Sequence, residues 1–192
     1  RTVGGRCFTD PVLFTDVVTT SAAVGATRAR KEKTAALAGL LRTAAPADVV
    51  PVVAWLSGVP RQGRIGTGWR TLSGVDVPAA AEPSLTVGQV DALLDELAGT
   101  AGTGSAARRR ELLTELYGAA TTEEQRFLHR LLTGELRQGA LEGLMVDAVA
   151  AASGVAAPAV RRAFMLSGRL PETAATALTG GQDALAAVNR QL

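Results

Sequence analysis

The sequence predicts an all-α fold: a compact bundle of roughly nine or ten short helices, arranged in two pseudo-repeated halves. Aromatic residues make up only 4% of the 192 residues, and Ala and Leu dominate, which favours closely packed helices over aromatic and β-branched strands. Apolar residues recur at helical spacing, and Gly or Pro separates the periodic stretches. With 47% hydrophobic and 20% charged residues, the chain can bury a core, so we expect it to fold by itself.

In the first half, two stretches have the pattern of paired helices. Residues 27–43 repeat apolar positions at amphipathic spacing. Residues 48–56 begin at Asp48, a favourable N-cap, tolerate Pro51 in the first turn and are followed by Gly58. We expect these two helices to pack as an antiparallel hairpin.

The next stretch, residues 59–77, is rich in Gly and predicts a loop anchored by Trp69. After it, Thr86 and Gln89 form a capping box for a helix that continues to about Leu97.

In the second half, Ser105 is expected to cap the first helix. A capping box of Thr121 with Glu124, or of Thr122 with Gln125, begins the next helix. Gly and Pro then separate three further predicted helices, at residues 141–152, 158–166 and 171–178.

The chain organises around one domain. Residues 1–12 have no initiator Met and no long apolar stretch, so we interpret them as a leader or upstream read-through, disordered and outside the fold. Residues 13–181 form the helical domain, with halves of about 13–101 and 102–181, and residues 182–192 form a C-terminal helix or linker. No stretch reaches the roughly 18 apolar residues that span a bilayer.

The net charge of +2 is too small to indicate a nucleic-acid binder by itself. The positive charges are nevertheless clustered, and each cluster is either a solvated helix face or part of a binding surface. The clusters are Arg28, Arg30, Lys31 and Lys33; Arg61, Arg64 and Arg70; and Arg108, Arg109 and Arg110.

A glycine turn ending in Gly104 and Ser105 leads residues 108–110, all Arg, into the first turns of a helix. Cations there oppose the helix dipole at a cost of about 0.3–1 kcal/mol each, whereas the free N–H groups attract an anion. The pattern is therefore consistent with phosphate binding and equally with the alternative, surface pairing of these arginines with Glu111 and Glu115.

Two other basic positions also adjoin glycines. Arg137 precedes Gly139, and Arg64 is followed by Gly66, so the backbone can approach a phosphate closely at both places. A fourth contact could come from two neighbouring cations on a short helix, Arg161 and Arg162.

No catalytic or metal site is visible. His129 is the only histidine and lies in an apparently packed helix, where a structural or surface role is expected. The single cysteine, Cys7, excludes an internal disulfide and a zinc site of familiar spacing, and fits a reducing, cytoplasmic setting. No Gly-Lys-Ser/Thr phosphate-binding loop is present.

An ordered set of motifs carries a resemblance that covers about residues 13–181. The motifs lie at residues 55–58, 64–69, 102–105, 110–116, 124–132, 134–140, 147–150 and 161–168. In this order they resemble the N-terminal DNA-binding domain of bacterial and archaeal ATP-dependent DNA ligases, most closely the shorter ligases of high-GC bacteria.

The resemblance implies a monomeric domain that lies on the minor groove of nicked double-stranded DNA and contacts phosphates on both sides of the break. The family's nucleotidyltransferase and oligonucleotide-binding-fold domains would be its partners in repair, replication and recombination, and ATP and Mg²⁺ would serve the full-length ligase. Neither Lys31 nor Lys33 begins the family's Lys-x-Asp-Gly adenylation motif, so this chain should bind no cofactor and be inactive alone. By motif position, the phosphate contacts fall on Arg64, Gly66, Gly104, Ser105, Arg108, Arg137, Gly139, Arg161 and Arg162.

Two other functions remain open. Residues 147–155 and the following helix have the spacing of a helix-turn-helix regulator, although residues 156–160 offer almost no side chain that could read bases. A helical protein-interaction scaffold would explain the core equally well, and only the phosphate-like turns speak against it.

Overall fold

Helices supply nearly all the regular structure in the computed structural model, which describes residues 11–63, 65–67, 69–72, 74–136 and 141–188. The described residues contain no strand, apart from an isolated bridge between Leu13 and Thr86. The all-α prediction is confirmed. None of the helices in these ranges is long and apolar enough to cross a membrane. The helices are α1 (Phe14–Ala26), α2 (Arg30–Thr43), α3 (Val49–Leu56), α4 (Trp69–Leu72), α5 (Val87–Gly99), α6 (Ser105–Ala119), α7 (Thr122–Thr133), α8 (Leu141–Ser153), α9 (Ala157–Ser167) and α10 (Leu170–Ala186).

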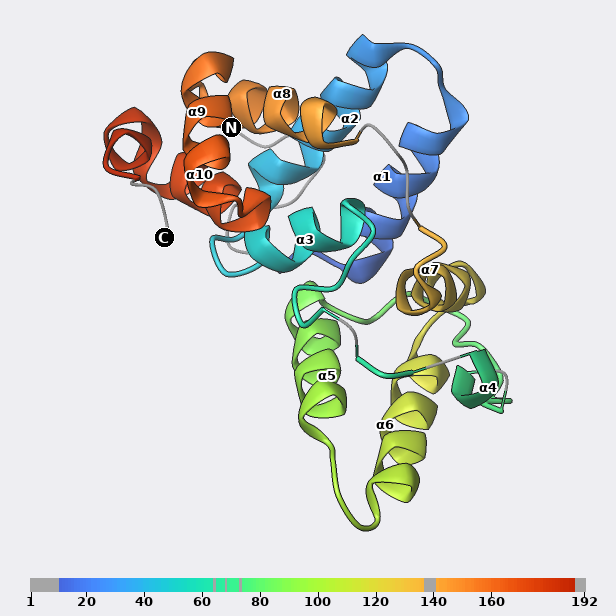
Figure 1. Cartoon of the computed structure of the whole chain (residues 1–192). Coiled ribbons are helices and arrows are strands. Elements are labelled where there is room, and N and C mark those ends of the chain that lie inside the picture. Colours follow the sequence, from blue (N-terminus) through green and yellow to red (C-terminus); the bar gives the residue numbers. More distant parts are fainter. Residues whose placement is uncertain (1–10, 64, 68, 73, 137–140, 189–192) are drawn as a thin grey trace.

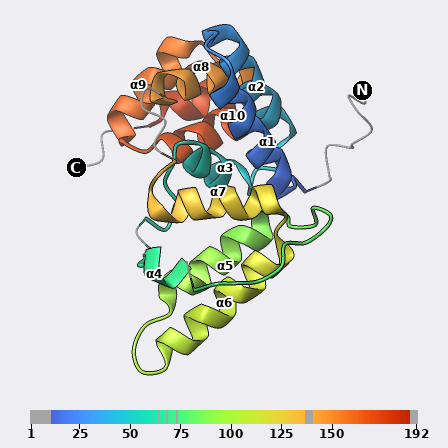
Figure 2. The same ribbon diagram turned by 90° about the vertical axis from the view of Figure 1, so that its right-hand side faces the viewer.

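The helices gather in two groups that are discontinuous in the chain. Helices α1–α3 lie with α8–α10, and α4–α7 form the other group, with α7 crossing between them (Figures 1 and 2). The most extensive packing between helices distant in the chain joins α2 to α8 and α3 to α10, so N-terminal helices pack on C-terminal ones. The boundary predicted near residue 101 falls in the turn between α5 and α6, which pack on each other. The spatial groups therefore differ from the predicted halves.

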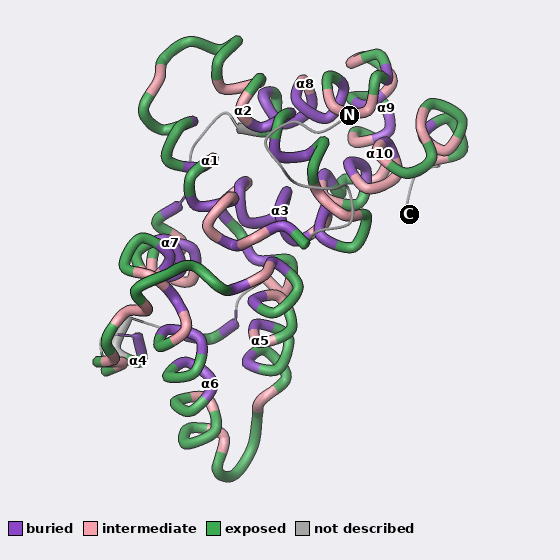
Figure 3. Tube along the Cα trace, turned by 180° about the vertical axis from the view of Figure 1, so that it is seen from behind, coloured by how far each residue is buried: buried purple, intermediate pink, exposed green. Residues whose placement is uncertain are grey.

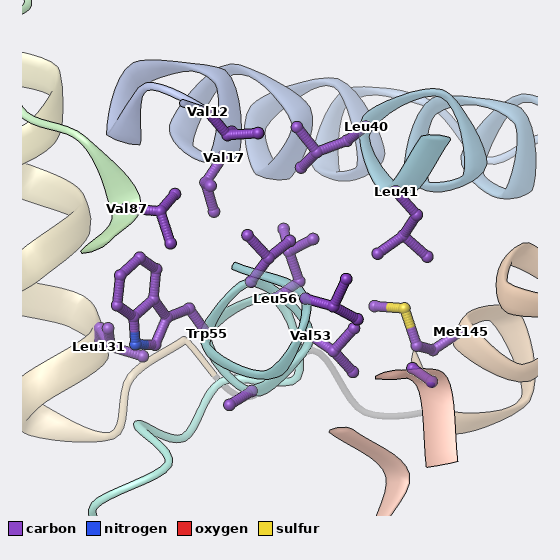
Figure 4. Packing of buried hydrophobic residues seen from close by; sticks show 14 of the residues in the cluster. Val12, Val17, Leu40, Leu41, Val53, Trp55, Leu56, Val87, Leu131 and Met145 are labelled. Carbon is purple, nitrogen blue, oxygen red and sulfur yellow. The ribbon is translucent and has the colours of Figure 1, made fainter. Parts of the chain in front are cut away.

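The predicted hairpin of α2 and α3 is wrong. Helix α2 packs mainly on α8 and α1, whereas α3 packs mainly on α10. The physical reason is that α3 is apolar all round: seven of its eight residues are buried, so it needs partners on every side. The close-up of the core shows α3 in cross-section, with buried side chains around its whole circumference (Figure 4).

Helix α1 was not predicted from the sequence. Its Thr- and Val-rich sequence has modest intrinsic helix propensity. Its buried residues nevertheless follow a helical period: Phe14, Val17, Val18, Ser21 and Val24. Tertiary burial of this one face stabilises the helix where propensity alone does not.

The two predicted capping boxes are confirmed, whereas a single predicted cap is not. The capping boxes of Thr86 with Gln89 and of Thr121 with Glu124 are both present, with the Thr121 N–H donating to Oε2 of Glu124 at 2.8 Å. Ser105 is a correction, because it is the first residue of α6 and Gly104, in the left-handed conformation, occupies the N-cap position.

The start of the chain also differs from its prediction. Val12 was placed outside the fold, but it is only 3% exposed, and its carbonyl accepts a 2.9 Å hydrogen bond from the Val87 N–H. The Val12 N–H in turn donates to the side chain of Asp48 at the N-cap of α3. Val12 therefore belongs to the core, and its predicted place in the leader is wrong.

Asp48 is buried at this junction, and its side chain makes no capping hydrogen bond to α3. Burial raises its pKa above the ordinary 3.8, against the lowering effect of the Val12 N–H, and the negative charge of Asp91 raises it further. The folded state consequently resists ionisation of this carboxyl.

We predict that Asp48→Asn is more stable than the wild type at pH 7. Because the folded pKa is raised, the contribution of Asp48 to stability is fully present below pH 3.8 and is lost as the pH rises through the folded pKa. The amide keeps an acceptor for the Val12 N–H and never ionises. Urea unfolding at several pH values checks this: the advantage of the variant should shrink in acid. A less stable variant at pH 7 would show that the helix dipole outweighs desolvation.

Candidate nucleic-acid interface

A glycine-rich loop follows α3 and presents its backbone at the surface. Gly63 and Gly66 have φ values of 70° and 71°, a left-handed conformation that glycine adopts without strain. Ile65 and Thr67 are each 6% exposed, whereas Gly66 between them is exposed. Gly66 is therefore the exposed residue of this segment, and the guanidinium of Arg109 lies beside it.

This loop forms one wall of a groove of about 510 Å³, and the end of α7 forms the other. The groove is lined by Gly58, Val59, Pro60, Gly63, Ile65, Gly66, Thr67, Leu131, Leu132, Thr133 and Gly134. Gly134 ends α7 in the left-handed conformation. Oγ1 of Thr67 is buried and has no hydrogen-bond partner among the described residues. Glycines thus line both walls of the groove, Gly63 and Gly66 from the loop and Gly134 from the end of α7.

A second glycine turn connects the end of α5 to the start of α6. Gly102 and Gly104 have φ values of 86° and 81°, and the turn is exposed (Figure 3). Arg108, one turn into α6, makes ion pairs with Glu96 on α5 and with Glu111, in which Nη1 lies 3.1 Å from Oε2 of Glu111. The hydrogen bond to Glu96, together with Glu111, raises the Arg108 pKa. The surface pairing weighed as the alternative to phosphate binding is therefore present at Arg108.

The middle arginine of the same run behaves differently. Arg109 is half-buried, and its Nη1 donates to the carbonyl oxygens of Leu97 at 2.9 Å and Thr100 at 3.1 Å. Its Nη2 donates to the carbonyl oxygen of Ile65 in the glycine-rich loop. Arg109 therefore joins the loop to the end of α5.

The two candidate cations of α9 lie in the other helix group, far along the molecule from the α5–α6 turn (Figure 1). Arg161 approaches Asp147 of α8 at 3.6 Å, and Arg30 of α2 donates to the same carboxylate at 2.7 Å. Arg162 is exposed and has no partner among the described residues.

The structure thus unites some of the predicted contacts and separates others. Gly66 lies beside the groove and, through Arg109, is linked to the helix that Gly104, Ser105 and Arg108 begin. The α9 arginines are not part of this surface. Three other predicted contacts lie outside the described residues: Arg64, Arg137 and Gly139.

Two residues of this surface were not singled out as contacts from the sequence. Arg109 had a usable signal, because it lies on the α6 face that also carries the buried Leu112, Leu113 and Leu116, at helical spacing. Its inward position was therefore predictable. Thr67 had no such signal, since burial of a loop hydroxyl depends on tertiary packing.

Comparison with known proteins supports the predicted resemblance. Residues 70–150 match the sequence model of the family described as "DNA ligase N terminus". The predicted resemblance is confirmed.

Among the most similar relatives are three proteins named probable DNA ligase. The chain is 65% identical over 175 residues to that of Nocardia farcinica, 60% over 174 residues to that of Saccharopolyspora erythraea, and 57% over 176 residues to that of Rhodococcus jostii. These alignments cover 91%, 91% and 92% of this chain but only 34%, 34% and 35% of the respective relatives. The chain therefore spans about a third of the length of the relatives it matches.

We predict opposite effects for two Gly→Ala substitutions. Gly66→Ala should destabilise the chain by about 1 kcal/mol, because alanine resists the left-handed conformation that Gly66 adopts. Gly39→Ala, on the exposed face of α2 with no atom within 4 Å of the added Cβ, should stabilise it by about 0.5–1 kcal/mol. Urea denaturation of both variants checks the pair. An unchanged stability of Gly66→Ala would mean that the loop leaves its left-handed conformation freely.

Proposed function

We propose that this chain binds nicked double-stranded DNA without sequence preference, through the phosphate backbone along the minor groove, as the DNA-binding domain of an ATP-dependent DNA ligase. The observation that carries the proposal is the glycine-rich loop, whose exposed backbone at Gly66 lines a groove between this loop and the end of α7. A ligase of this kind acts in the cytoplasm of a bacterium, in repair, replication and recombination.

The chemistry of this surface favours phosphate over bases. A bare glycine backbone can come close to a rod-like sugar-phosphate chain, and its N–H groups donate to phosphate oxygens. The lining of the groove contains no Asn, Gln or Arg that could read a base edge among the described residues. Recognition should therefore depend on the shape and charge of the duplex, and not on its sequence.

We assign the contacts to the loop around Arg64 and Gly66, to the turn of Gly104, Ser105 and Arg108, to Arg137 and Gly139, and more weakly to Arg161 and Arg162. The covalent steps would belong to other domains of the parent ligase. The chain has no Lys-x-Asp-Gly motif, so ATP and Mg²⁺ would act at the nucleotidyltransferase domain. That domain and an oligonucleotide-binding fold would be its partners on DNA, and the chain itself would act as a monomer.

Fluorescence anisotropy tests the proposal directly. The chain is titrated against a nicked duplex, an intact duplex and a duplex of scrambled sequence, over a series of salt concentrations. We expect sequence-independent binding whose log affinity falls against log salt with a slope of roughly −0.9 per neutralised phosphate. Arg137→Ala should weaken binding to all three duplexes and reduce the slope by about one such unit.

Other outcomes would support the rival functions. A strong preference for one duplex sequence would favour a helix-turn-helix regulator, in which α8 and α9 flank the turn at Gly154. No binding to any duplex at low salt would contradict the proposal and favour a protein-interaction scaffold.

The ion pairs of Arg108 lead to a further prediction, in which a substitution strengthens DNA binding. Glu96→Gln removes a negative charge from the α5–α6 surface and releases Arg108 from its interhelical partner. We expect binding to nicked DNA to strengthen by up to about fivefold, the range of an exposed ion pair. Glu123→Gln is the matched control, because its partner Arg126 lies on α7 and is not a proposed contact. Equal effects of the two variants would show a general charge effect and no role of Arg108.

A further inference from the structure

Arg109 occupies an unusual position for a residue in an exposed basic run. Its neighbours Arg108 and Arg110 are exposed, whereas its guanidinium is half-buried and donates to three carbonyl oxygens. Two of these, from Leu97 and Thr100, belong to the last turn and C-cap of α5. The third, from Ile65, lies in the glycine-rich loop, 44 residues away in the chain.

We propose that Arg109 is a positioning residue, which holds the backbone of Ile65–Thr67 in the conformation that receives a DNA phosphate, without touching DNA itself. The inference rests on the proposed function, because it assigns to the loop the phosphate contact made there. It differs from the assignment of Arg108, whose charge would face the phosphate directly.

The chemistry of the contact requires arginine. The last carbonyls of a helix have no intrahelical donor and carry the negative end of the helix dipole, so a cation at the end of α5 is stabilised. The planar guanidinium has donors in a fixed fork, so it can serve Leu97, Thr100 and Ile65 together. A lysine would bring the same charge as a single flexible ammonium and could not reproduce this bridge.

Loss of Arg109 should affect the loop locally, because the loop is held to the helices at two separate places. Residues 61 and 62, at the start of the loop, are held by hydrogen bonds of Arg61 and Gln62 to the carboxylates of Asp91 and Asp95 on α5. The part that carries Gly66 is held by Arg109, and a Cβ added at Gly66 would lie 3.4 Å from Nη2 of Arg109. Loss of Arg109 should therefore free Ile65–Thr67 while the helices stay folded.

The first arm of the test uses the chain without DNA. Backbone ¹⁵N order parameters at Ile65, Gly66 and Thr67 should fall in Arg109→Gln from about 0.85, the value of a rigid backbone, toward 0.6. Arg110→Gln removes the same charge from the next position and should leave these order parameters unchanged. Circular dichroism confirms that each variant is folded.

The second arm measures anisotropy with the nicked duplex. We expect Arg109→Gln to bind about tenfold more weakly, because the competent loop conformation becomes a minor population. Arg109→Lys keeps the charge and loses the fork, so it should behave like Arg109→Gln in both arms.

The outcomes separate this inference from the function on which it rests. Full affinity in Arg109→Lys together with a mobile loop would show that charge matters and the bridge does not. Weaker binding with unchanged order parameters would mean that Arg109 touches DNA, and unchanged order parameters and affinity would mean that it has no role; each result overturns the proposal. If the wild-type chain binds no duplex, the proposed function fails, whereas the first arm still decides whether Arg109 orders the loop.

Discussion

The contact on which the fold depends is the edge-to-face cluster of three aromatic rings, those of Phe14, Trp55 and Phe127. The ring of Phe14, at the first residue of α1, meets Trp55 of α3 edge to face at 5.5 Å and Phe127 of α7 at 5.6 Å. All three residues are buried. Because α1 and α3 belong to one helix group and α7 to the other, this cluster ties the groups together. In a chain with 4% aromatic residues, so concentrated a use of them marks the site that needs the largest apolar contacts.

The same cluster supports the candidate interface from behind. Trp55 lies beside Leu131 of α7 in the core (Figure 4), and Leu131 is also in the lining of the groove. The loop that leaves α3 at Ser57 begins two residues after Trp55. The two walls of the groove thus extend from two helices that the aromatic rings fix to each other. Its shape is accordingly determined by the core, and a binding surface that recognises backbone shape needs this rigidity.

The sequence predicted what local chemistry decides and missed what tertiary packing decides. The boxes at Thr86 and Thr121 could be read because cap and partner lie three residues apart. Helix α3 could be located but not paired, because a helix that is apolar on every side does not specify its neighbours. Val12 was missed because its burial comes from contacts with Val87 and Asp48, distant in the chain. Of the interface, the left-handed glycines were foreseeable, and the hydroxyl of Thr67 was not.

The electrostatics of the chain explain why shape should dominate the contact with DNA that we propose. The net charge is only +2, and several arginines are already engaged: Arg30 with Asp147, Arg61 with Asp91, and Arg108 with Glu96. Each such pair lowers the positive potential that a phosphate meets, so long-range attraction is weak. Under the proposed function, affinity must then come from a few close backbone contacts made by pre-ordered loops. The guanidinium of Arg109 donates to three carbonyl oxygens. By ordering the loop it would contribute more to DNA affinity than it would as one more exposed charge.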